Sequence, residues 1–524
     1  MSEYLKLKST NERQSINIET RIVEPQTISD NASGGQATFL LPTSGLLDRG
    51  TRVVIPVKGA DTEQMFALSA GGFGVVQSAT LRDHLGNTIC QTNDLGQYMA
   101  WYNLHRPCAY RERVQACKTG NGFCWEESDR YKLKGSTFKG MKDANYFYDV
   151  NDDSKGKVTE RFAFTNNDTF EIILSLQDLF PELFGSLMLP LGVLEGALTL
   201  QLIFAPQTER GVAKAANNGT PAAAGAITID TANVKMVLDL LYFDDGTMAR
   251  LRAESNKGIP MVYGDLVTIK NAMVGDSGLA TPGAGAGSEV EKSFEFDIGL
   301  SNLNIRYVIC SFTTSQLGTQ TDPSPLSTMG KYHSLAPRKV NGGLSTQLVI
   351  NNQPHYPEPV TFFPRQYSEL QEVHGFPLYV PQPLYSFQGV VWDAYAVEQL
   401  KSGITTAPAN LPAVGAYCLA TETVNTATGA NSRIIAPSSD EGKINNSFQL
   451  TCAGATRYVG FNLRHTRQNV IGAGTRVGNA PVQLKLRYTF DGNSLAAKNN
   501  LNLVSFVCVE RKMMIKNGRI FVTN

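Results

Sequence analysis

The sequence has little charge, and its charges balance. Asp, Glu, Lys and Arg make up only 18% of the 524 residues, below the usual quarter. Lys plus Arg and Asp plus Glu number 47 each. Because neutralising phosphates requires a surplus of cationic groups, this balance disfavours bulk nucleic-acid binding, and no sequence-specific nucleic acid is expected as a partner. Weak repulsion between neutral copies permits self-association.

Long apolar runs are missing as well. No uninterrupted run reaches the length of about 20 residues that a membrane-spanning helix needs. The nearest candidate, residues 183–205, is interrupted by Pro190, Glu195 and Gln201. The N-terminal stretch MSEYLKLKSTNERQ lacks the apolar region of a secretory signal, so synthesis in a reducing compartment is expected.

Catalytic and cofactor-binding motifs are also absent. The sequence contains no G-x-S-x-G, H-E-x-x-H or G-x-x-x-x-G-K-[ST] pattern, so we assign no catalytic residue, cofactor site or metal ligand. Cys108, Cys117 and Cys124, with His105 upstream, lack the spacing of a zinc knuckle. Ordinary loop thiols are favoured there, with a zinc site or a disulfide as alternatives. Cys310 in YVICSF and Cys508 in VSFVCVE are predicted to be buried thiols.

The stretch Thr169–Ala205 shows two strand patterns around a short helical segment. Apolar residues alternate with other residues in both strands, which is the period of a half-buried strand. The apolar positions are Phe170, Ile172, Leu174 and Leu176 in the first strand and Leu198, Leu200, Leu202 and Phe204 in the second. Between the strands, Asp178 is predicted to cap a turn of helix with Pro181 in its first turn.

Apolar side chains and a proline mark the rest of this stretch as architectural. Leu179, Phe180, Leu183 and Phe184 give the helical segment an apolar face, which we expect to plug the sandwich or its seam with a second domain. Pro190 cannot donate a hydrogen bond to a strand ladder. The sequence Leu189-Pro190-Leu191 is therefore predicted to form a corner.

Strand patterns fall into two successive series. Residues 1–32 are polar without a sustained period and are predicted to be an N-terminal arm. One series covers 33–245 and ends in an apolar strand with Tyr242 and Phe243, a helical linker follows at 246–257, and the second series covers 258–510. Residues 511–524 would form a C-terminal extension. Short strands joined by loops rich in Gly, Pro and Asn predict an all-β fold of two β-sandwiches.

The segment 353–392 is rich in proline and aromatic residues, among them Phe376 and Trp392. Exposed aromatic side chains there would mark an interface with another subunit. Packing of these side chains beneath their own loop is the alternative, and the sequence favours neither.

The order of these segments resembles the double jelly-roll major capsid proteins of icosahedral double-stranded DNA viruses. That lineage includes virophages, Polinton-like viruses and nucleocytoplasmic large DNA viruses. The resemblance lies in three places: Phe180, Phe184 and Leu189-Pro190-Leu191 before the strand Leu198–Phe204; the strand and helical connector Val237–Glu254, with Tyr242 and Phe243; and the last strand with its MMIKNGRIFV continuation, Phe506–Val522.

The resemblance implies a fold of two tandem eight-stranded jelly-roll β-sandwiches with short helices and long loops. It implies a non-enzymatic major capsid protein, made inside the host cell and located in the virion, whose pseudo-hexagonal homotrimers tile an icosahedral shell. The implied partners are the chain itself, neighbouring capsomers, and penton and minor capsid or cement proteins. An internal membrane, reached by the N-terminal arm, is a further implied partner.

Two other classes of protein remain as alternatives. A minor virion protein, such as a vertex or turret component, would differ from a major shell protein in its stoichiometry. A carbohydrate-binding or carbohydrate-degrading β-sandwich protein would need stacked tryptophans or paired carboxylates. The sequence has only three tryptophans and no acid pair in a strand context, so this class ranks below the capsid protein.

The predicted arm leads to a deletion experiment. Removing residues 1–32 is expected to impair shell assembly and to leave the soluble trimer intact, because the arm would contact partners on the inner side of the shell. Electron microscopy of particles and the mass of the soluble protein measure the two effects. Normal particles from the truncated protein would contradict this expectation.

Overall fold

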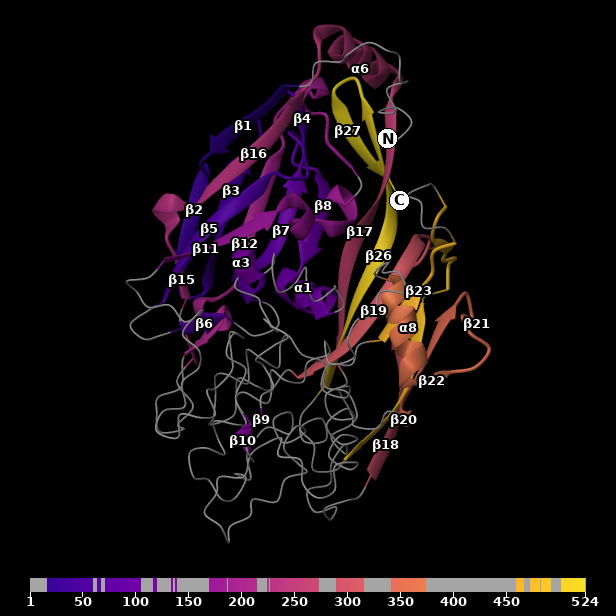
Figure 1. Cartoon of the computed structure of the whole chain (residues 1–524). Helices are drawn as coiled ribbons and strands as arrows, with labels where there is room; N and C mark the ends of the chain where they lie inside the picture. Colours follow the sequence, from indigo (N-terminus) through magenta and orange to yellow (C-terminus); the bar gives the residue numbers. More distant parts are fainter. Residues whose placement is uncertain are drawn as a thin grey trace.

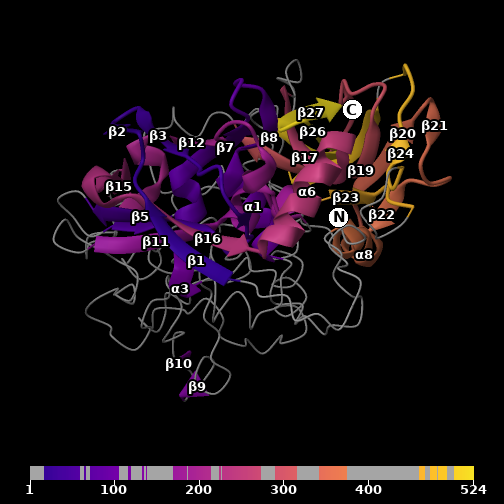
Figure 2. The same cartoon turned by 90° about the horizontal axis from the view of Figure 1, so that it is seen from above.

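The chain forms two β-sandwiches that stand side by side in the computed structural model (Figure 1). The view from above shows the first sandwich at one end of the molecule and the second at the other (Figure 2). The structure describes residues 17–59, 64–66, 71–104, 116–119, 133–134, 137–138, 169–185, 187–213, 224–225, 227–272, 289–314, 341–373, 459–465, 472–480, 482–491 and 501–523.

The first sandwich contains two antiparallel sheets, which we call 1A and 1B. In order across the sheet, 1A consists of β1 (Asn17–Val23), β16 (Lys235–Tyr242), β5 (Arg52–Gly59) and β11 (Thr169–Ser175), with β4 (Leu46–Leu47) on β16 and β15 (Ile227–Ile229) on β5. Sheet 1B consists of β2 (Thr27–Asn31), β3 (Gly34–Leu40), β12 (Thr199–Phe204), β7 (Val76–Arg82) and β8 (Thr88–Asn93). Two small sheets accompany them: β14 (Ala224–Gly225), β13 (Gly211–Ala213) and β6 (Gln64–Phe66), and the pair β9 (Leu133–Lys134) and β10 (Thr137–Phe138).

The second sandwich also contains two antiparallel sheets, 2A and 2B. Sheet 2A consists of β17 (Ile259–Ala272), β26 (Leu501–Lys516), β19 (Asn304–Thr314) and β23 (Val459–Asn462), with β24 (Thr475–Arg476) on β19 and β27 (Arg519–Thr523) on β26. Sheet 2B consists of β18 (Glu289–Asp297), β25 (Gln483–Asp491), β20 (Asn341–Ile350) and β21 (Gln353–Pro354), with β22 (Val360–Phe362) on β20.

Both sandwiches have the same strand order within the described residues. In chain order, the main strands of the first are β1, β3, β5, β7, β8, β11, β12 and β16, and those of the second are β17, β18, β19, β20, β21, β23, β25 and β26. We number the eight main strands of each sandwich 1 to 8 in chain order. In both sandwiches one sheet then has the strands side by side in the order 1, 8, 3, 6, and the other has them in the order 2, 7, 4, 5. Strands that are consecutive in the chain therefore lie mostly in opposite sheets, which is the jelly-roll arrangement.

Alternating side chains produce the core of the first sandwich. In β16, Met236, Leu238 and Leu240 are fully buried, while the residues between them are half-buried. In β11, Ile172 and Leu174 are buried in the same way. Successive residues of a strand point to opposite faces, so these side chains meet those of sheet 1B, such as Leu81 and Leu200, in one continuous apolar cluster.

The helices are short and connect the strands. They are α1 (Leu95–Leu104), α3 (Ala116–Thr119), α4 (Leu176–Leu179), α5 (Pro181–Phe184), α6 (Asp245–Lys257) and α8 (Phe363–Val373). Helix α6 joins the two sandwiches at the position expected for the linker. The side chain of its N-cap residue, Asp244, accepts a hydrogen bond from the Thr247 backbone N–H at 2.6 Å. No helix in the described part of the chain is both long and apolar enough to span a bilayer.

The structure corrects the expected N-terminal arm. Residues 17–31 form β1 and β2, and all of β1 pairs with β16 from Asn17 opposite Tyr242 to Val23 opposite Met236. No residue of β1 is buried, and its two isoleucines, Ile18 and Ile22, are separated on their face by Thr20, so the apolar pattern is too weak to predict a strand. Removing residues 1–32 deletes the first strand of sheet 1A. We therefore expect that deletion to destabilise the first sandwich, contrary to the expectation from the sequence of an intact trimer.

The C-terminal extension also differs from the expectation. Strand β26 runs without a break through the expected boundary at 510 and ends at Lys516. A turn at Asn517 and Gly518, both with positive φ, then leads into β27, which pairs with the end of β26. Residues 511–516 thus continue a core strand and form a hairpin with the last strand.

A buried ion pair fixes β2 to the end of the first sandwich. The side chains of Arg210 and Asp30 are 0% and 4% exposed, and Nη2 lies 2.6 Å from Oδ1. Arg210 also donates to the backbone oxygens of Ala205 at 2.7 Å and Ile227 at 2.9 Å. Asp30 accepts from the Ile229 backbone N–H at 2.9 Å. A buried charge pair is tolerated when its remaining hydrogen-bonding capacity is also used.

This pair allows a stability prediction. Arg210→Met should lower the free energy of unfolding by about 3–5 kcal/mol, because it leaves the Asp30 carboxylate buried without its counter-charge. Denaturant titration of the purified protein measures the loss. The matched control is Arg49→Met at an exposed position, which should change stability by less than about 0.5 kcal/mol. Equal effects of the two substitutions would contradict a structural role for the pair.

Candidate functional site

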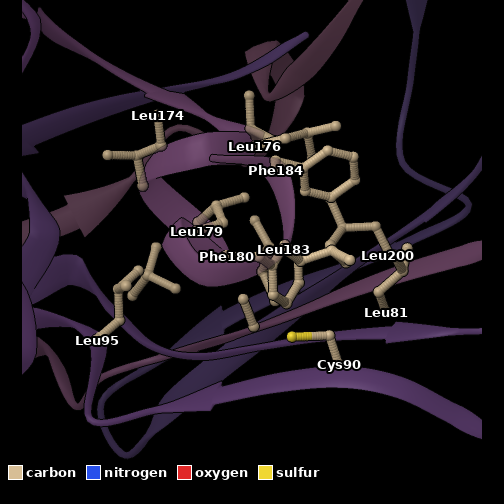
Figure 3. Close-up of a cluster of buried hydrophobic side chains, with 14 of the residues drawn as sticks. Leu81, Cys90, Leu95, Leu174, Leu176, Leu179, Phe180, Leu183, Phe184 and Leu200 are labelled. Carbon is tan, nitrogen blue, oxygen red and sulfur yellow. The ribbon is translucent and has the colours of Figure 1, made fainter. Parts of the chain in front are cut away.

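The segment between β11 and β12 carries apolar side chains into the core where the first sandwich meets the second. Figure 3 shows Leu176, Leu179, Phe180, Leu183 and Phe184 converging on one cluster with side chains of the surrounding strands. All five are at most 1% exposed. The rings of Phe180 and Phe184 lie 6.2 Å apart. Phe180 and Phe184, which the sequence predicted to plug the sandwich or its seam with the second domain, are core residues of the first sandwich.

The cap of this segment differs from the prediction. Ser175, the last residue of β11, is the N-cap of α4, and Asp178 is the third helical residue. The Asp178 carboxylate accepts from the Ser175 backbone N–H at 3.0 Å and from its hydroxyl at 2.7 Å, while Ser175 Oγ accepts from the Asp178 N–H at 3.2 Å. This is a capping box. The cap falls at Ser175 because the extended backbone of β11 ends there.

Side chains of β17 form hydrogen bonds with backbone groups along the open edge of β8. Strand β8 is the terminal strand of sheet 1B, and β17 is the terminal strand of sheet 2A. Tyr263 donates its hydroxyl to the Ile89 backbone oxygen, and Thr268 Oγ1 donates to the Asn93 oxygen at 3.3 Å. Asp265 Oδ1 accepts from the Gln91 N–H at 3.5 Å. An open strand edge is a template for unwanted pairing, and here the second sandwich covers it.

A second set of polar side chains, which includes Glu182 of α5, connects the two sandwiches across the seam between them. The Tyr307 hydroxyl of β19 donates to Glu182 Oε1 at 2.8 Å and lies 3.1 Å from the Tyr98 hydroxyl of α1. Arg464 Nη2 lies 3.6 Å from Glu182 Oε2, and its guanidinium stacks over the Tyr307 ring at 4.9 Å. Two residues of the first sandwich and two of the second therefore form one hydrogen-bonded and ionic group.

Burial keeps the hydroxyls of Tyr98 and Tyr307 and the nearby Cys508 thiol neutral. Desolvation, followed by the nearby Glu182 charge, raises the pKa of Tyr98 and Tyr307 well above the usual range. The same two causes raise the pKa of the buried Cys508 thiol. The hydroxyls therefore remain hydrogen-bond donors over the physiological range.

Sheet 2A is buried on both faces. Tyr307, Ile309, Phe506 and Cys508 belong to the apolar cluster of the first sandwich. Their strand neighbours Val308 and Val507 point to the opposite face, yet they are also 0% exposed. One face of the sheet thus packs on the first sandwich, and the other packs toward sheet 2B. The prediction that Cys310 and Cys508 are buried thiols is confirmed.

The Leu-Pro-Leu corner packs beside β4, and the residues just after it contact the linker helix and the C-terminal hairpin. Leu189, Pro190 and Leu191 are all buried, and the Leu189 oxygen accepts from the Leu47 N–H at 2.8 Å. Beyond the corner, the Glu195 N–H donates to the Gly518 oxygen at 3.0 Å, and Arg519 pairs with the Glu195 carboxylate at 3.3 Å. A Cβ at Gly518 would lie 2.5 Å from Glu195 Cγ, so this contact requires glycine.

The other residues named from the sequence are spread more widely. Tyr242 and Phe243 are half-buried at the end of β16, where the Tyr242 hydroxyl lies 3.1 Å from Ser44 Oγ. Phe376 and Trp392 lie outside the described residues, as do His105, Cys108 and Cys124, while Cys117 lies in α3. Within the described residues, no group of three or more His, Cys, Asp or Glu side chains could hold a metal ion.

Sequence reasoning did not identify the polar residues of the seam. Glu182 follows a proline in the first turn of a helix, where acidic residues are common. Tyr98, Tyr307 and Arg464 have no motif that would mark them, and they come from distant parts of the chain. Only the strand topology brings them together.

No family model and no curated protein matches the sequence. The fold matches solved structures along nearly the whole chain. A chain of the Sputnik virophage, from its cryo-EM structure, aligns with 99% of this chain and 92% of its own length at 10% identity and a TM-score of 0.52. The mavirus major capsid protein aligns with 99% of this chain and 93% of its own length at 12% identity and a TM-score of 0.45. The Faustovirus major capsid protein covers 96% and 91% at 7% identity and a TM-score of 0.49.

The likeness to the Sputnik chain shows the fold. Together with the strand order repeated in both sandwiches, it defines a double jelly roll. The fold class predicted from the sequence is thereby confirmed.

The polar group at the seam yields a further prediction. Tyr307→Phe should destabilise the docking of the two sandwiches by about 1–3 kcal/mol, because it leaves the half-buried Glu182 carboxylate without its hydroxyl donor. Hydrogen exchange of β8 and β17 measures the change locally. Tyr242→Phe, which also removes a hydroxyl contact but within the first sandwich, should leave exchange at these strands unchanged. Unaltered exchange in Tyr307→Phe would contradict the assignment.

Proposed function

We propose that the chain is the major capsid protein of an icosahedral virus and that its homotrimers are the pseudo-hexagonal blocks of the shell. The observation that carries the proposal is the likeness to a chain of the Sputnik virophage, which covers 99% of this chain and 92% of that one, together with the strand order that both sandwiches of this chain share. Its place is then the virion, and its work is assembly rather than catalysis.

The seam supports this proposal through rigidity. Two sandwiches joined only by a linker helix would move relative to one another. Here apolar packing on sheet 2A, the covered edge of β8 and the docked C-terminal hairpin hold them in one orientation. A shell made of many copies needs such a block, because a variable angle within each copy would prevent regular tiling.

Further partners follow from the same proposal. Neighbouring capsomers, penton proteins and minor capsid or cement proteins would contact the outer surfaces of the trimer. The segment before β1 would reach minor proteins or an internal membrane.

Oligomeric mass tests the proposal. Size-exclusion chromatography with light scattering should give three times the chain mass of 57.1 kDa, and electron microscopy should show a hexagonal outline. A monomer with activity on glycans would overturn the proposal in favour of a carbohydrate-active β-sandwich.

A core variant tests whether trimers require the segment between β11 and β12. Phe184→Asp should abolish soluble trimer, because it places an unpaired charge at a position that is 0% exposed and the buried charge destabilises the fold. Phe521→Asp is the matched control at a side chain that is 51% exposed, and its trimer should persist. Normal trimers from Phe184→Asp would show that the segment tolerates solvent.

A further inference from the structure

The hairpin of β26 and β27 exposes an apolar row on its outer face. Its inner face consists of three buried core residues, Met513, Ile515 and Ile520. On the outer face Met514 lies opposite Phe521, and the two side chains are 45% and 51% exposed. The exposed Pro260 of β17 lies opposite Met514 on its other side. Three neighbouring strands therefore place apolar residues side by side on a face where contact with water normally favours polar ones.

Cationic side chains flank this row. Lys512 and Lys516 are exposed, and they share the face of Met514 because alternate residues of a strand point the same way. Arg519 of β27 lies opposite Lys516, is 57% exposed and pairs with the Glu195 carboxylate at 3.3 Å. We call this surface the hairpin face, and it consists of Pro260, Lys512, Met514, Lys516, Arg519 and Phe521.

Helix α6 adds further positive charge beside the hairpin face. The turn of the hairpin is fixed to this helix, because the Asn517 backbone N–H donates to the Ser255 oxygen at 3.2 Å. Figure 1 shows α6 and β27 together at one end of the molecule. Residues 245–257 and 511–523 contain seven Lys or Arg and two Asp or Glu, whereas the whole chain has 47 of each kind. Positive charge is therefore concentrated on these two elements.

Apolar side chains between cations match the chemistry of an anionic lipid surface. Apolar side chains of peripheral proteins insert at the boundary between headgroups and acyl chains, while Lys and Arg are attracted to anionic headgroups. The long stems of lysine and arginine allow their charged ends to reach the headgroups from beside an inserted apolar residue. An acidic polymer would complement the cations but would leave Met514 and Phe521 in water. A lipid surface complements both.

We propose that the hairpin face binds a membrane surface that contains anionic phospholipids. Met514 and Phe521 insert among the headgroups, and Lys512 and Lys516 contact the negatively charged groups of the lipids. The inference goes beyond the proposed function, because it concerns a surface that each single chain carries. It also does not involve the segment before β1.

Flotation with phospholipid vesicles tests the inference. The purified protein should float with vesicles of phosphatidylcholine and phosphatidylserine but not with vesicles of phosphatidylcholine alone. Raising the salt concentration from about 0.1 M to about 1 M should release it, because the Debye length falls from about 10 Å to about 3 Å. Equal flotation with both kinds of vesicle, or binding to polyglutamate without flotation, would overturn the inference. Light scattering of the same sample gives the oligomeric mass, so a failure of the proposed function is detected separately.

Paired substitutions distinguish the local surface from net charge. Lys512→Gln/Lys516→Gln should weaken binding to the anionic vesicles by about tenfold or more, since each cation near an anionic surface adds to the attraction. Lys58→Gln/Lys485→Gln is the matched control, because it removes the same charge from side chains that are 39% and 47% exposed on β5 and β25. Its binding should be unchanged. Equal losses in the two double variants would contradict a role for the hairpin face.

A further substitution tests the insertion of the apolar row. Phe521→Ser should weaken vesicle binding by about tenfold, because its ring would no longer leave water on binding. Ile203→Ser is the control at a side chain that is 38% exposed on β12, and it should bind as the unmodified protein does. Both variants should keep the circular dichroism spectrum of the unmodified protein. Undiminished binding by Phe521→Ser would overturn the proposed insertion.

Discussion

Burial of both faces of sheet 2A is the constraint on which the rest of the structure depends. In an isolated sandwich one face of each sheet meets water, and apolar residues occupy only alternate positions. Along β26, Phe506, Val507 and Cys508 are all 0% exposed, because one face packs on sheet 2B and the other on the first sandwich. Each large apolar side chain removed from water contributes about 1.5–3 kcal/mol. The two jelly rolls are therefore one folding block.

The polar contacts at the seam set the direction of this packing. Apolar burial is not directional, so it does not by itself determine how one sandwich sits on the other. Hydrogen bonds from β17 side chains to the β8 backbone, and the contacts of Glu182 with Tyr307 and Arg464, require one relative position. Gly518 against Glu195 adds a third point of contact away from the other two. Three separated contacts fix a rigid orientation.

The sequence predicted most of the fold where apolar residues alternate. Ile172, Leu174, Leu200 and Leu202 lie in the core as expected, because a half-buried strand has a simple period. Strand β1 was missed because none of its residues is buried and its apolar period is limited to Ile18 and Ile22, with Thr20 between them. The polar seam was missed because Glu182 and Arg464 meet only through the topology.

High-resolution electron microscopy of the purified protein tests the central claim most directly, which is that the contacts at the seam hold the two jelly rolls in one orientation. The account predicts one relative position of the two sandwiches in every copy, with β17 placed against β8 and the Tyr307 hydroxyl hydrogen-bonded to Glu182. Copies in which the angle between the two sandwiches varies, or in which the edge of β8 is exposed, would contradict it.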